Sequence, residues 1–181
     1  EATSFNQPLN NWDVSKVKRM NRMFYEATSF NQDLCEWVMS TETYTSGMFQ
    51  DATAFNADPN TRPPRRVFTT HQTLKTAVDE LLALDPTGAT PHPIHGPINN
   101  WDVSNVKDMN NMFYGATSFN QPLNKWNVSR VKDMIMMFDG ATSFNQPLNE
   151  WDVSKVEGMS SMFRGATSFN QPLNEWNVSK V

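Results

Sequence analysis

Carboxylates recur beside a tryptophan along this chain, and stacked carboxylates are one arrangement that can collect a metal cation. Asp13, Asp102 and Asp152 occupy this position, whereas Asn127 and Asn177 place a neutral amide there. An Asx turn, in which a short side chain accepts a hydrogen bond from nearby backbone, suits aspartate and asparagine equally. The sequence also lacks the glycine-rich nonapeptide of calcium-binding repeats. We therefore predict Asx turns at these positions and no metal site.

Histidine and cysteine are the other residues that could carry chemistry. His92 and His95 are three residues apart, but Pro93 separates them and no thiol is near in sequence, so we expect no metal there. Cys35 has no identifiable base beside it, which predicts an unreactive thiol. The sequence contains no Ser–His–Asp set, phosphate-binding loop or paired-carboxylate cleft. These observations predict that the protein is not an enzyme and needs no cofactor.

Polar residues at fixed positions are expected to bond the protein's own backbone. The NVS sequences at 127–129 and 177–179 match the acceptor pattern for N-glycosylation. Both lie where the repeat described below already explains them, and we interpret them as coincidence. A recurring threonine is expected to bond the backbone at a corner, and a recurring asparagine to bond the neighbouring repeat. These residues are Thr3, Thr28, Thr53, Thr117, Thr142 and Thr167, and Asn6, Asn31, Asn56, Asn120, Asn145 and Asn170.

Length and charge limit the classes of partner. A chain of 181 residues suggests one or two domains. Its net charge of -4 gives no electrostatic basis for binding nucleic acid. No apolar run approaches the ~20 residues that a membrane span needs. The chain begins and ends within its repeated motif, so we expect a piece of a longer array whose uncapped coils offer end-to-end self-association.

The elements that position these residues are set by an internal repeat. All six tryptophans fall in one slot, and every step between them except the second is 25 residues. Phenylalanine and methionine recur in further slots, and a period of this length is typical of leucine-rich repeats. We expect the following residues to form the interior: Trp12, Trp37, Trp101, Trp126, Trp151, Trp176, Phe24, Phe113, Phe138, Phe163, Met109, Met134 and Met159.

Two textures alternate within each repeat. Val17, Met20, Met23 and Phe24 have the spacing of a short α-helix or 3₁₀ turn. Ser15 precedes this stripe, and its hydroxyl is expected to cap the helix N-terminus. Beyond the stripe the chain is expected to be extended, with a proline that keeps any strand short. A glycine ends the stripe in the later repeats, where a left-handed residue can terminate a helix: Gly115, Gly140 and Gly165.

One repeat alone cannot bury enough apolar surface to offset the entropy of ordering it, whereas stacked repeats cover each other. The sequence therefore predicts an α/β repeat fold. We expect a leucine-rich-repeat-like, right-handed solenoid of about seven coils, with a short extended segment and a short helix or 3₁₀ turn in each 25-residue coil.

An interruption separates two arrays. Residues 1–56 read as about two coils, the second degenerate, and residues 94–181 as about three and a half. Between them, residues 57–93 form an irregular insertion with an amphipathic helix near 70–84, capped by Thr69 or Thr70 and ended by Pro86. The insertion either enlarges one coil of a continuous solenoid, which we favour, or its helix caps the apolar end of a second array.

The string VxxMxxMFxGATSFNQPLNxWDVS closely resembles the repeat of the BspA-like leucine-rich-repeat surface proteins, including those of mycoplasmas. Residues 106–129, 131–154 and 156–179 carry it, and the resemblance covers nearly all of the chain outside 57–93. It departs in the second repeat, where Glu42 and Thr45 stand at slots expected to be apolar. The resemblance implies a solenoid, often at a cell surface, with binding or adhesive roles and no established chemistry.

One position changes freely while its neighbours repeat, so selectivity for a partner would be encoded there. We take it as the candidate interaction face of a non-catalytic scaffold that binds protein or forms surface structure. A carbohydrate-binding or adhesive surface module is the alternative, and an enzyme of unknown class a distant one. The residues of this face are Asn11, Glu36, Asn100, Lys125, Glu150 and Glu175.

Overall fold

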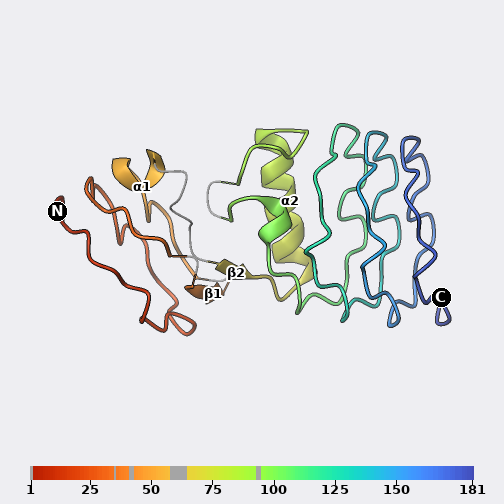
Figure 1. Cartoon of the computed structure of the whole chain (residues 1–181), viewed down its shortest axis with the longest axis horizontal. Helices are drawn as coiled ribbons and strands as arrows, with labels where there is room; N and C mark the ends of the chain where they lie inside the picture. The colour runs from red at the N-terminus through yellow and green to blue at the C-terminus, as the bar shows by residue number, and fades with distance from the viewer. Residues whose placement is uncertain (1, 35, 41–42, 58–64, 93–94) are drawn as a thin grey trace. The chain divides into compact units, whose positions relative to one another are not determined.

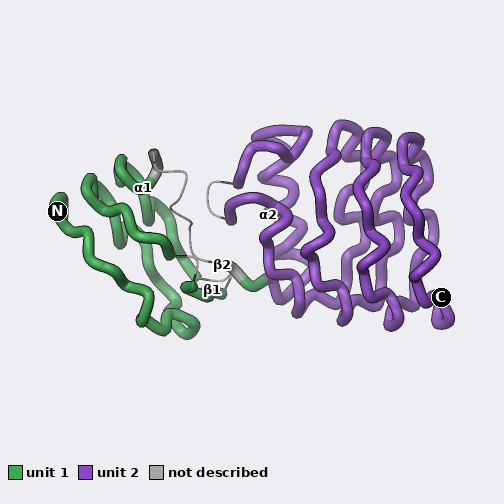
Figure 2. Tube along the Cα trace, viewed as in Figure 1, with its two compact units in different colours: residues 1–67 green, residues 68–181 purple. Residues whose placement is uncertain are grey.

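Two compact units make up the chain in the computed structural model, Glu1–Val67 and Phe68–Val181 (Figure 2). The structure describes residues 2–34, 36–40, 43–57, 65–92 and 95–181, with backbone only at 56–57 and 65–66. Cys35, Pro93 and most of the proline- and arginine-rich stretch, 58–64, lie outside these residues. The predictions of an unreactive thiol and of an irregular insertion over these residues therefore stay predictions.

Regular secondary structure is sparse among the described residues, because most of each repeat consists of turns. Figure 1 shows the helices and strands that are present. In chain order they are β1 (Val38–Ser40), α1 (Thr53–Ala57), β2 (Arg65–Val67), α2 (His71–Leu84) and the 3₁₀ helix η1 (Ile98–Asn100).

Unit 1 contains the first repeats and one parallel strand pair. β1 pairs with β2 so that Val38 lies opposite Arg65 and Ser40 opposite Val67. The sequence indicated only a degenerate repeat followed by an irregular insertion here. Val38 occupies the slot that holds aspartate or asparagine in the other repeats, and its side chain has no acceptor for an Asx turn. The backbone is instead extended and pairs with a segment from beyond the repeat.

Stacked aromatic rings form the interior of unit 1. The Phe24 and Phe30 rings lie 4.1 Å apart, and Phe30 stacks in turn on Phe55 at 5.8 Å. Trp37 is buried, but Trp12, which was expected in the interior, is 53% exposed. Trp12 stacks on Trp37 at 6.1 Å on one side only. Its other side faces the hollow at the outer end of the first repeat, so the expectation for Trp12 is wrong.

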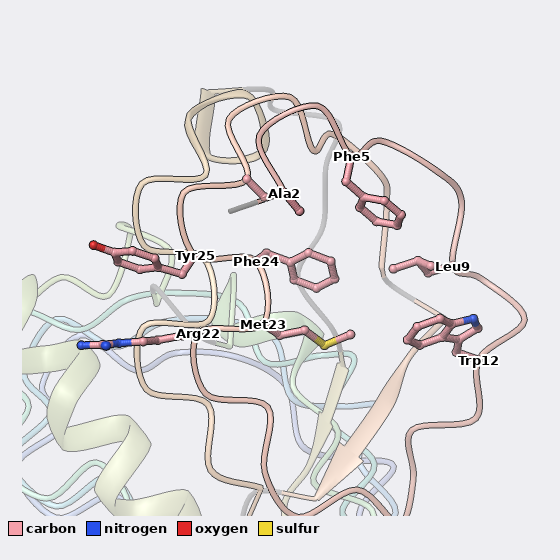
Figure 3. Close-up of a pocket in the computed structure, with 9 residues that line it drawn as sticks. Ala2, Phe5, Leu9, Trp12, Arg22, Met23, Phe24 and Tyr25 are labelled. Atoms are coloured by element: carbon pink, nitrogen blue, oxygen red, sulfur yellow. The ribbon is translucent and has the colours of Figure 1, made fainter.

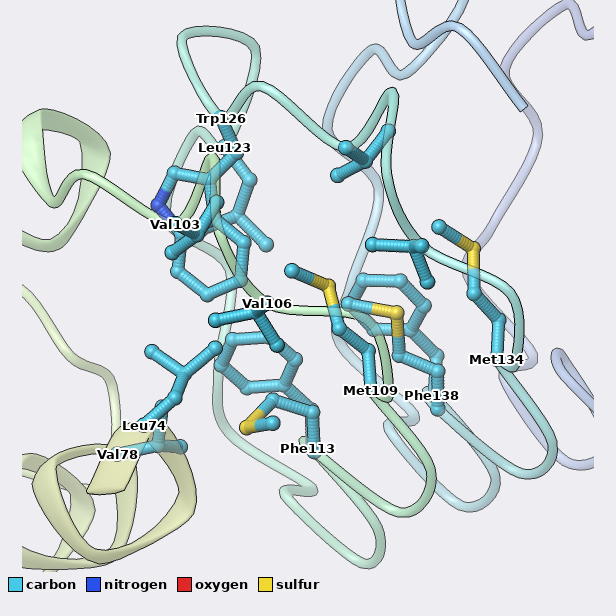
Figure 4. Close-up of a cluster of buried hydrophobic side chains, with 14 of the residues drawn as sticks. Leu74, Val78, Val103, Val106, Met109, Phe113, Leu123, Trp126, Met134 and Phe138 are labelled. Atoms are coloured by element: carbon cyan, nitrogen blue, oxygen red, sulfur yellow. The ribbon is translucent and has the colours of Figure 1, made fainter. Parts of the chain in front are cut away.

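Helix α2 opens unit 2 and packs on its first repeat. The Thr70 hydroxyl caps it by accepting from the backbone N–H of Thr73, as its sequence signal indicated. The helix ends at Leu84, as predicted, with Asp85 between it and Pro86. Figure 4 shows Leu74 and Val78 reaching toward the repeat interior. The buried face of α2 and the first repeat therefore share one hydrophobic cluster.

The apolar stripe after each serine is a run of turns and not a helix. In unit 2 the backbone N–H groups of Met109, Asn111, Phe113 and Gly115 donate to carbonyls of the following repeat, at 2.8–3.0 Å. Backbone N–H groups that donate to the next repeat cannot also form the hydrogen bonds of an α-helix, which run to the carbonyl four residues earlier. Within the repeat, i→i+3 bonds such as Tyr114 N–H to Asn111 O close single turns, which resemble isolated 3₁₀ turns.

Each stripe contains two residues with a positive φ angle, and this also excludes a helix. In unit 2 one of them is the expected glycine, for example Gly140 (φ 74°). In unit 1 the same slot holds another residue type, for example Glu26 (φ 54°). The other falls four residues earlier, at residues of varied type. Each left-handed residue reverses the local chain direction, so the stripe turns a corner where a helix would run straight. These earlier residues are Arg22, Gly47, Asn111, Met136 and Ser161.

The serine before each stripe does not cap a helix. The Ser104 hydroxyl and backbone N–H both donate to Asp102 Oδ1, at 2.7 and 3.1 Å. Ser129 N–H donates in the same way to Asn127 Oδ1 at 3.1 Å. The prediction of Asx turns is therefore confirmed, and the N-cap prediction is wrong because the serine is the donor.

Columns of side chains fill the interior of unit 2. Trp101, Trp126 and Trp151 are 3% exposed, and Phe113, Phe138, Met109 and Met134 are fully buried. The Phe113 and Phe138 rings stack at 5.3 Å, and Phe138 and Phe163 at 5.6 Å. In the last repeat Met159, Phe163 and Trp176 are only partly buried, because no described repeat covers their outer side.

Candidate interaction surfaces

The predicted face, here called the pre-tryptophan column, is solvent-exposed in both units. All six of its residues fall in the exposed class. Within unit 2, Lys125 Nζ donates to Asn100 Oδ1 at 3.1 Å, and Lys125 N–H donates to Asn99 Oδ1 at 3.1 Å. Residues 25 apart in sequence are therefore neighbours along this column. Their side chains differ in charge, but the column is only one residue wide in each repeat.

The tryptophan beside this column holds it in place. Trp126 Nε1 donates to Ile98 O at 2.8 Å, Trp151 Nε1 to Leu123 O at 3.0 Å, and the same bond links the later repeats. Each indole therefore anchors its repeat to the backbone of the preceding one. Trp101 has no earlier repeat of this kind in unit 2 and donates instead to Gly96 O at 3.1 Å.

Polar ladders fix the side of each repeat that carries asparagine and threonine. Asn145 N–H donates to Asn120 Oδ1 at 2.9 Å, and Gln146 Nε2 donates to the same oxygen at 3.1 Å. Thr142 Oγ1 donates to Thr117 O at 3.0 Å. The asparagine column thus bonds the neighbouring repeat, as expected. The threonine column bonds backbone, as expected, but that of the preceding repeat, so both kinds of side chain stabilise the fold.

A second surface, which sequence reasoning missed, lies over the inter-repeat backbone bonds of unit 2. We call it the ladder face. Its side chains come from equivalent slots of three consecutive repeats, and all but Asp139 are exposed or half-buried. They are Lys107, Asp108, Asn110, Asn111 and Tyr114; Lys132, Asp133, Ile135, Met136 and Asp139; and Glu157, Gly158, Ser160, Ser161 and Arg164.

Ion pairs order part of the ladder face. Lys132 Nζ lies 3.0 Å from Glu157 Oε1. Arg164 binds the largely buried Asp139 with two hydrogen bonds, from Nε to Oδ1 at 3.1 Å and from Nη2 to Oδ2. These bonds raise the pKa of Arg164 above its ordinary value. The aromatic ring of Tyr114, 57% exposed, belongs to the same column of slots.

The three repeats of unit 2 differ at several slots of the ladder face. One slot holds Asp108, Asp133 and Gly158 in successive repeats, and another holds Tyr114, Asp139 and Arg164. At Gly158 an added Cβ would lie 2.8 Å from Asp133 Oδ1. The backbone under these varied residues is nearly the same in each repeat. The sequence contained a signal for this face, because its slots change from repeat to repeat. A helix was predicted there, and a helix would not bring those slots onto one surface.

The residues that suggested chemistry have structural roles where they are described. Hydrogen bonds from the hydroxyl and backbone of Ser154 lower the pKa of Asp152, as expected for an Asx turn. His92, almost fully buried, places Nε2 3.2 Å from Glu80 Oε2 and accepts from the His95 N–H through Nδ1 at 3.2 Å. The two imidazoles lie 4.5 Å apart and pack against Trp101. These contacts place His92 in the interior and pack the half-buried His95 against it at the start of unit 2.

Within the described ranges, no group of three or more histidine, cysteine, aspartate or glutamate residues is arranged to hold a metal ion. The helices in the same ranges are each too short or too polar to cross a bilayer.

Comparison with known proteins gives one match. A family model described as "Mycoplasma protein of unknown function, DUF285" matches residues 1–80 and 88–181. No curated protein matches the sequence. No solved structure matches it either.

Proposed function

Because the chain belongs to the DUF285 family of mycoplasma proteins of unknown function, we propose that it is a non-catalytic repeat scaffold that binds a protein partner through its ladder face. In this proposal the repeats form a leucine-rich-repeat-like, right-handed solenoid of the BspA-like kind, displayed at a cell surface. The backbone bonds of the ladder supply a rigid support, and the differing side chains above it supply selectivity.

One observation carries the proposal: side-chain chemistry changes from repeat to repeat over an invariant, hydrogen-bonded backbone. The amide-to-carbonyl bonds from Met109 to Asp133 and from Met134 to Gly158 are both 2.8 Å long. A surface of this kind loses little conformational entropy on binding, because its support is already ordered. Interfaces also favour tyrosine and arginine, and Tyr114 and Arg164 provide both.

A carbohydrate-binding or adhesive role is the second candidate. It is favoured by the exposed ring of Tyr114, which lies in the same column of slots as the Asp139–Arg164 pair. An aromatic ring packs against the apolar face of a sugar, while carboxylate and guanidinium groups bond its hydroxyls. The pre-tryptophan column is the competing location for either kind of partner.

Selection from a random-peptide library displayed on phage, run beside a printed glycan array, tests the proposal. Enriched peptides should bind the wild type and lose at least about tenfold in affinity with Tyr114→Ala or Lys107→Glu, which is 1.4 kcal/mol or more. Leu84→Ala, at an exposed apolar residue of α2 outside both surfaces, is the matched control and should bind normally.

Three other outcomes would count against this proposal. Loss of peptide binding with Lys125→Glu alone would move the site to the pre-tryptophan column. Glycan binding that Tyr114→Ala abolishes, without any enriched peptide, would support the carbohydrate alternative. A small molecule that raises the melting temperature saturably, and is consumed on incubation, would indicate an enzyme. Thermal melts of every variant show whether each one remains folded.

A further inference from the structure

The first two repeats of unit 1 carry a basic surface that the proposed function does not use. Its side chains occupy the slots that form the ladder face in unit 2, and none of these slots in unit 1 holds a carboxylate. We call it the basic face and define it by Lys18, Arg19, Arg22, Tyr25 and Tyr44. Positive charge and aromatic rings are therefore gathered on one side of unit 1, although the whole chain has a net charge of -4.

Backbone hydrogen bonds between the two repeats hold the basic face in place. Tyr44 N–H donates to Lys18 O at 2.9 Å, and Met20 N–H donates to Tyr44 O at 2.7 Å. These bonds make Arg19 and Tyr44 partners in a parallel bridge. The Tyr44 side chain is 59% exposed. A guanidinium group and an exposed aromatic ring thus extend from neighbouring positions of a fixed backbone.

A second guanidinium group of the basic face lies over a second ring. Arg22 has a positive φ of 55°, and its backbone N–H donates to Ser46 O at 3.1 Å. Its guanidinium carbon lies 5.4 Å from the centre of the Tyr25 ring, within the range of a cation–π contact. Figure 3 shows both side chains extending to the same side, away from Phe24. A guanidinium that lies on a ring keeps the N–H groups at its edge accessible to an anion.

The cations of the basic face are not neutralised within the part of the chain that the structure describes. Among those residues, Lys18, Arg19 and Arg22 form no ion pair. Two cations of the ladder face, Lys132 and Arg164, are each paired with a carboxylate of a neighbouring repeat. The three cations of the basic face therefore offer positive charge to an anion from outside the protein.

Exposure of the basic face does not depend on what precedes the first repeat. The face lies on the flank of the repeats, over the bonds that join them. In unit 2 the same flank stays exposed where repeats lie on both sides, since the Lys132 side chain is 61% exposed between its two neighbours. A further repeat would therefore extend the basic face and leave it open to solvent.

Acidic side chains mark the Tyr25 end of the basic face. A hydrogen bond from the Tyr25 side chain to Glu26, together with the negative charges of Glu26 and Asp51, raises the pKa of Tyr25 above its ordinary value. These carboxylates repel an anion at that end. A bound anion is therefore expected at the other end, beside Lys18, Arg19 and Tyr44.

We infer that the basic face binds a sulfated polysaccharide. Residues 16–22 read KVKRMNR, and short runs rich in lysine and arginine are typical of surfaces that bind heparin or nucleic acid. The planar fork of Arg19 binds two oxygens of one tetrahedral oxyanion, as it does with phosphate. The neighbouring Tyr44 ring packs against the apolar face of a sugar. A nucleic acid carries charge on every nucleotide and calls for a longer basic stripe, without the carboxylates of Glu26 and Asp51 beside it.

Fluorescence anisotropy with a labelled heparin oligosaccharide, titrated with the whole 181-residue chain, tests the inference. We expect a dissociation constant of about 1–50 µM near 0.1 M salt. Its logarithm should rise with that of the salt concentration with a slope of about 2–3, as for other linear polyanions. Arg19→Glu should weaken binding at least about tenfold, and Arg22→Gln about threefold or more. Lys155→Glu, at an exposed cation of unit 2, makes the same change in net charge as Arg19→Glu and should bind like the wild type.

Removal of an aromatic ring separates recognition of the sugar from attraction between charges. Tyr44→Ala should weaken heparin binding about threefold to tenfold while leaving the salt slope unchanged. Tyr114→Ala, at the exposed tyrosine of the ladder face, is the matched control and should bind heparin normally. Arg19→Glu should in turn leave peptide binding by the ladder face intact, so failure of this inference and failure of the proposed function are distinguishable.

Four results would overturn the inference. They are no heparin binding by the wild type at about 0.1 mM, equal binding of unsulfated hyaluronan, tighter binding of single-stranded DNA than of heparin, and equal losses for Lys155→Glu and Arg19→Glu. Thermal melts show whether each variant is folded. If Arg19→Glu lowers the melting temperature, Arg19→Gln removes the charge without reversing it and should still weaken heparin binding about threefold or more.

Discussion

Replacement of Trp126 by alanine tests whether the indole column is the interior of unit 2. The side chain is 3% exposed, its ring lies 5.8 Å from that of Phe113, and its Nε1 donates to Ile98 O at 2.8 Å. Truncation of a buried tryptophan costs ~3–5 kcal/mol through lost burial and the cavity left behind. Ile98 O keeps a hydrogen bond from the Trp101 N–H at 3.1 Å, so the lost indole bond leaves no buried acceptor unpaired and we expect a loss near the middle of that range.

The assay is urea unfolding followed by far-UV circular dichroism, with the free energy of unfolding taken from the midpoint and slope. The two units can unfold separately, so the change should appear in the transition of unit 2 alone. Trp126→Phe keeps most of the apolar surface but removes the hydrogen bond, and we expect a loss of about 1–2 kcal/mol.

Trp12→Ala is the matched control, because this tryptophan occupies the same slot but is 53% exposed. It should cost about 1–2 kcal/mol, because its indole is only partly buried. Equal losses for Trp12→Ala and Trp126→Ala, or a loss below about 1 kcal/mol for Trp126→Ala, would refute an interior tryptophan column.

Other variants test separate parts of unit 2 by the same unfolding measurement. Gly88→Ala should cost about 2–4 kcal/mol, because φ is +70° and the new Cβ would lie 2.8 Å from the Phe119 ring; Gly115→Ala, with a similar φ and open space, should cost only about 1–2 kcal/mol. Leu74→Ala should cost ~2–5 kcal/mol by opening a cavity under α2, and a loss below 1 kcal/mol would show that α2 is not part of this interior. Hydrogen bonds from the hydroxyls and backbone of two following threonines hold the pKa of Asp85 well below its ordinary value, so its stabilisation is present above about pH 4 and is lost as pH falls through the lowered pKa. Asp85→Asn should therefore lower the melting temperature at pH 7 and have a smaller effect near pH 2, and an effect that grows on acidification would contradict this.

The buried columns could be predicted from sequence because a strict period identifies residues that share an environment. Trp126 and Trp151 stand 25 positions apart and are equally buried. Helix α2 was also predictable, since its apolar spacing and Thr70 cap are both local signals. The Asx turns followed from the interchange of aspartate and asparagine in one slot.

The turns of each stripe could not be predicted in the same way. Turns closed by i→i+3 bonds place apolar side chains at nearly the same spacing as a short helix. What separates the two is a positive φ at Arg22, Asn111, Met136 and Ser161, none of which is a glycine that would have revealed it. The ladder face depends on those turns and on bonds between repeats, and was missed for the same reason.

The indole bonds all point toward the N-terminus. Trp126, Trp151 and Trp176 each donate to a carbonyl that precedes them by 28 residues. During synthesis the acceptor therefore leaves the ribosome before the donor that needs it. A growing chain can complete each tryptophan's bond as that residue emerges, so folding is able to follow translation one repeat at a time, with only the newest repeat waiting for its cover.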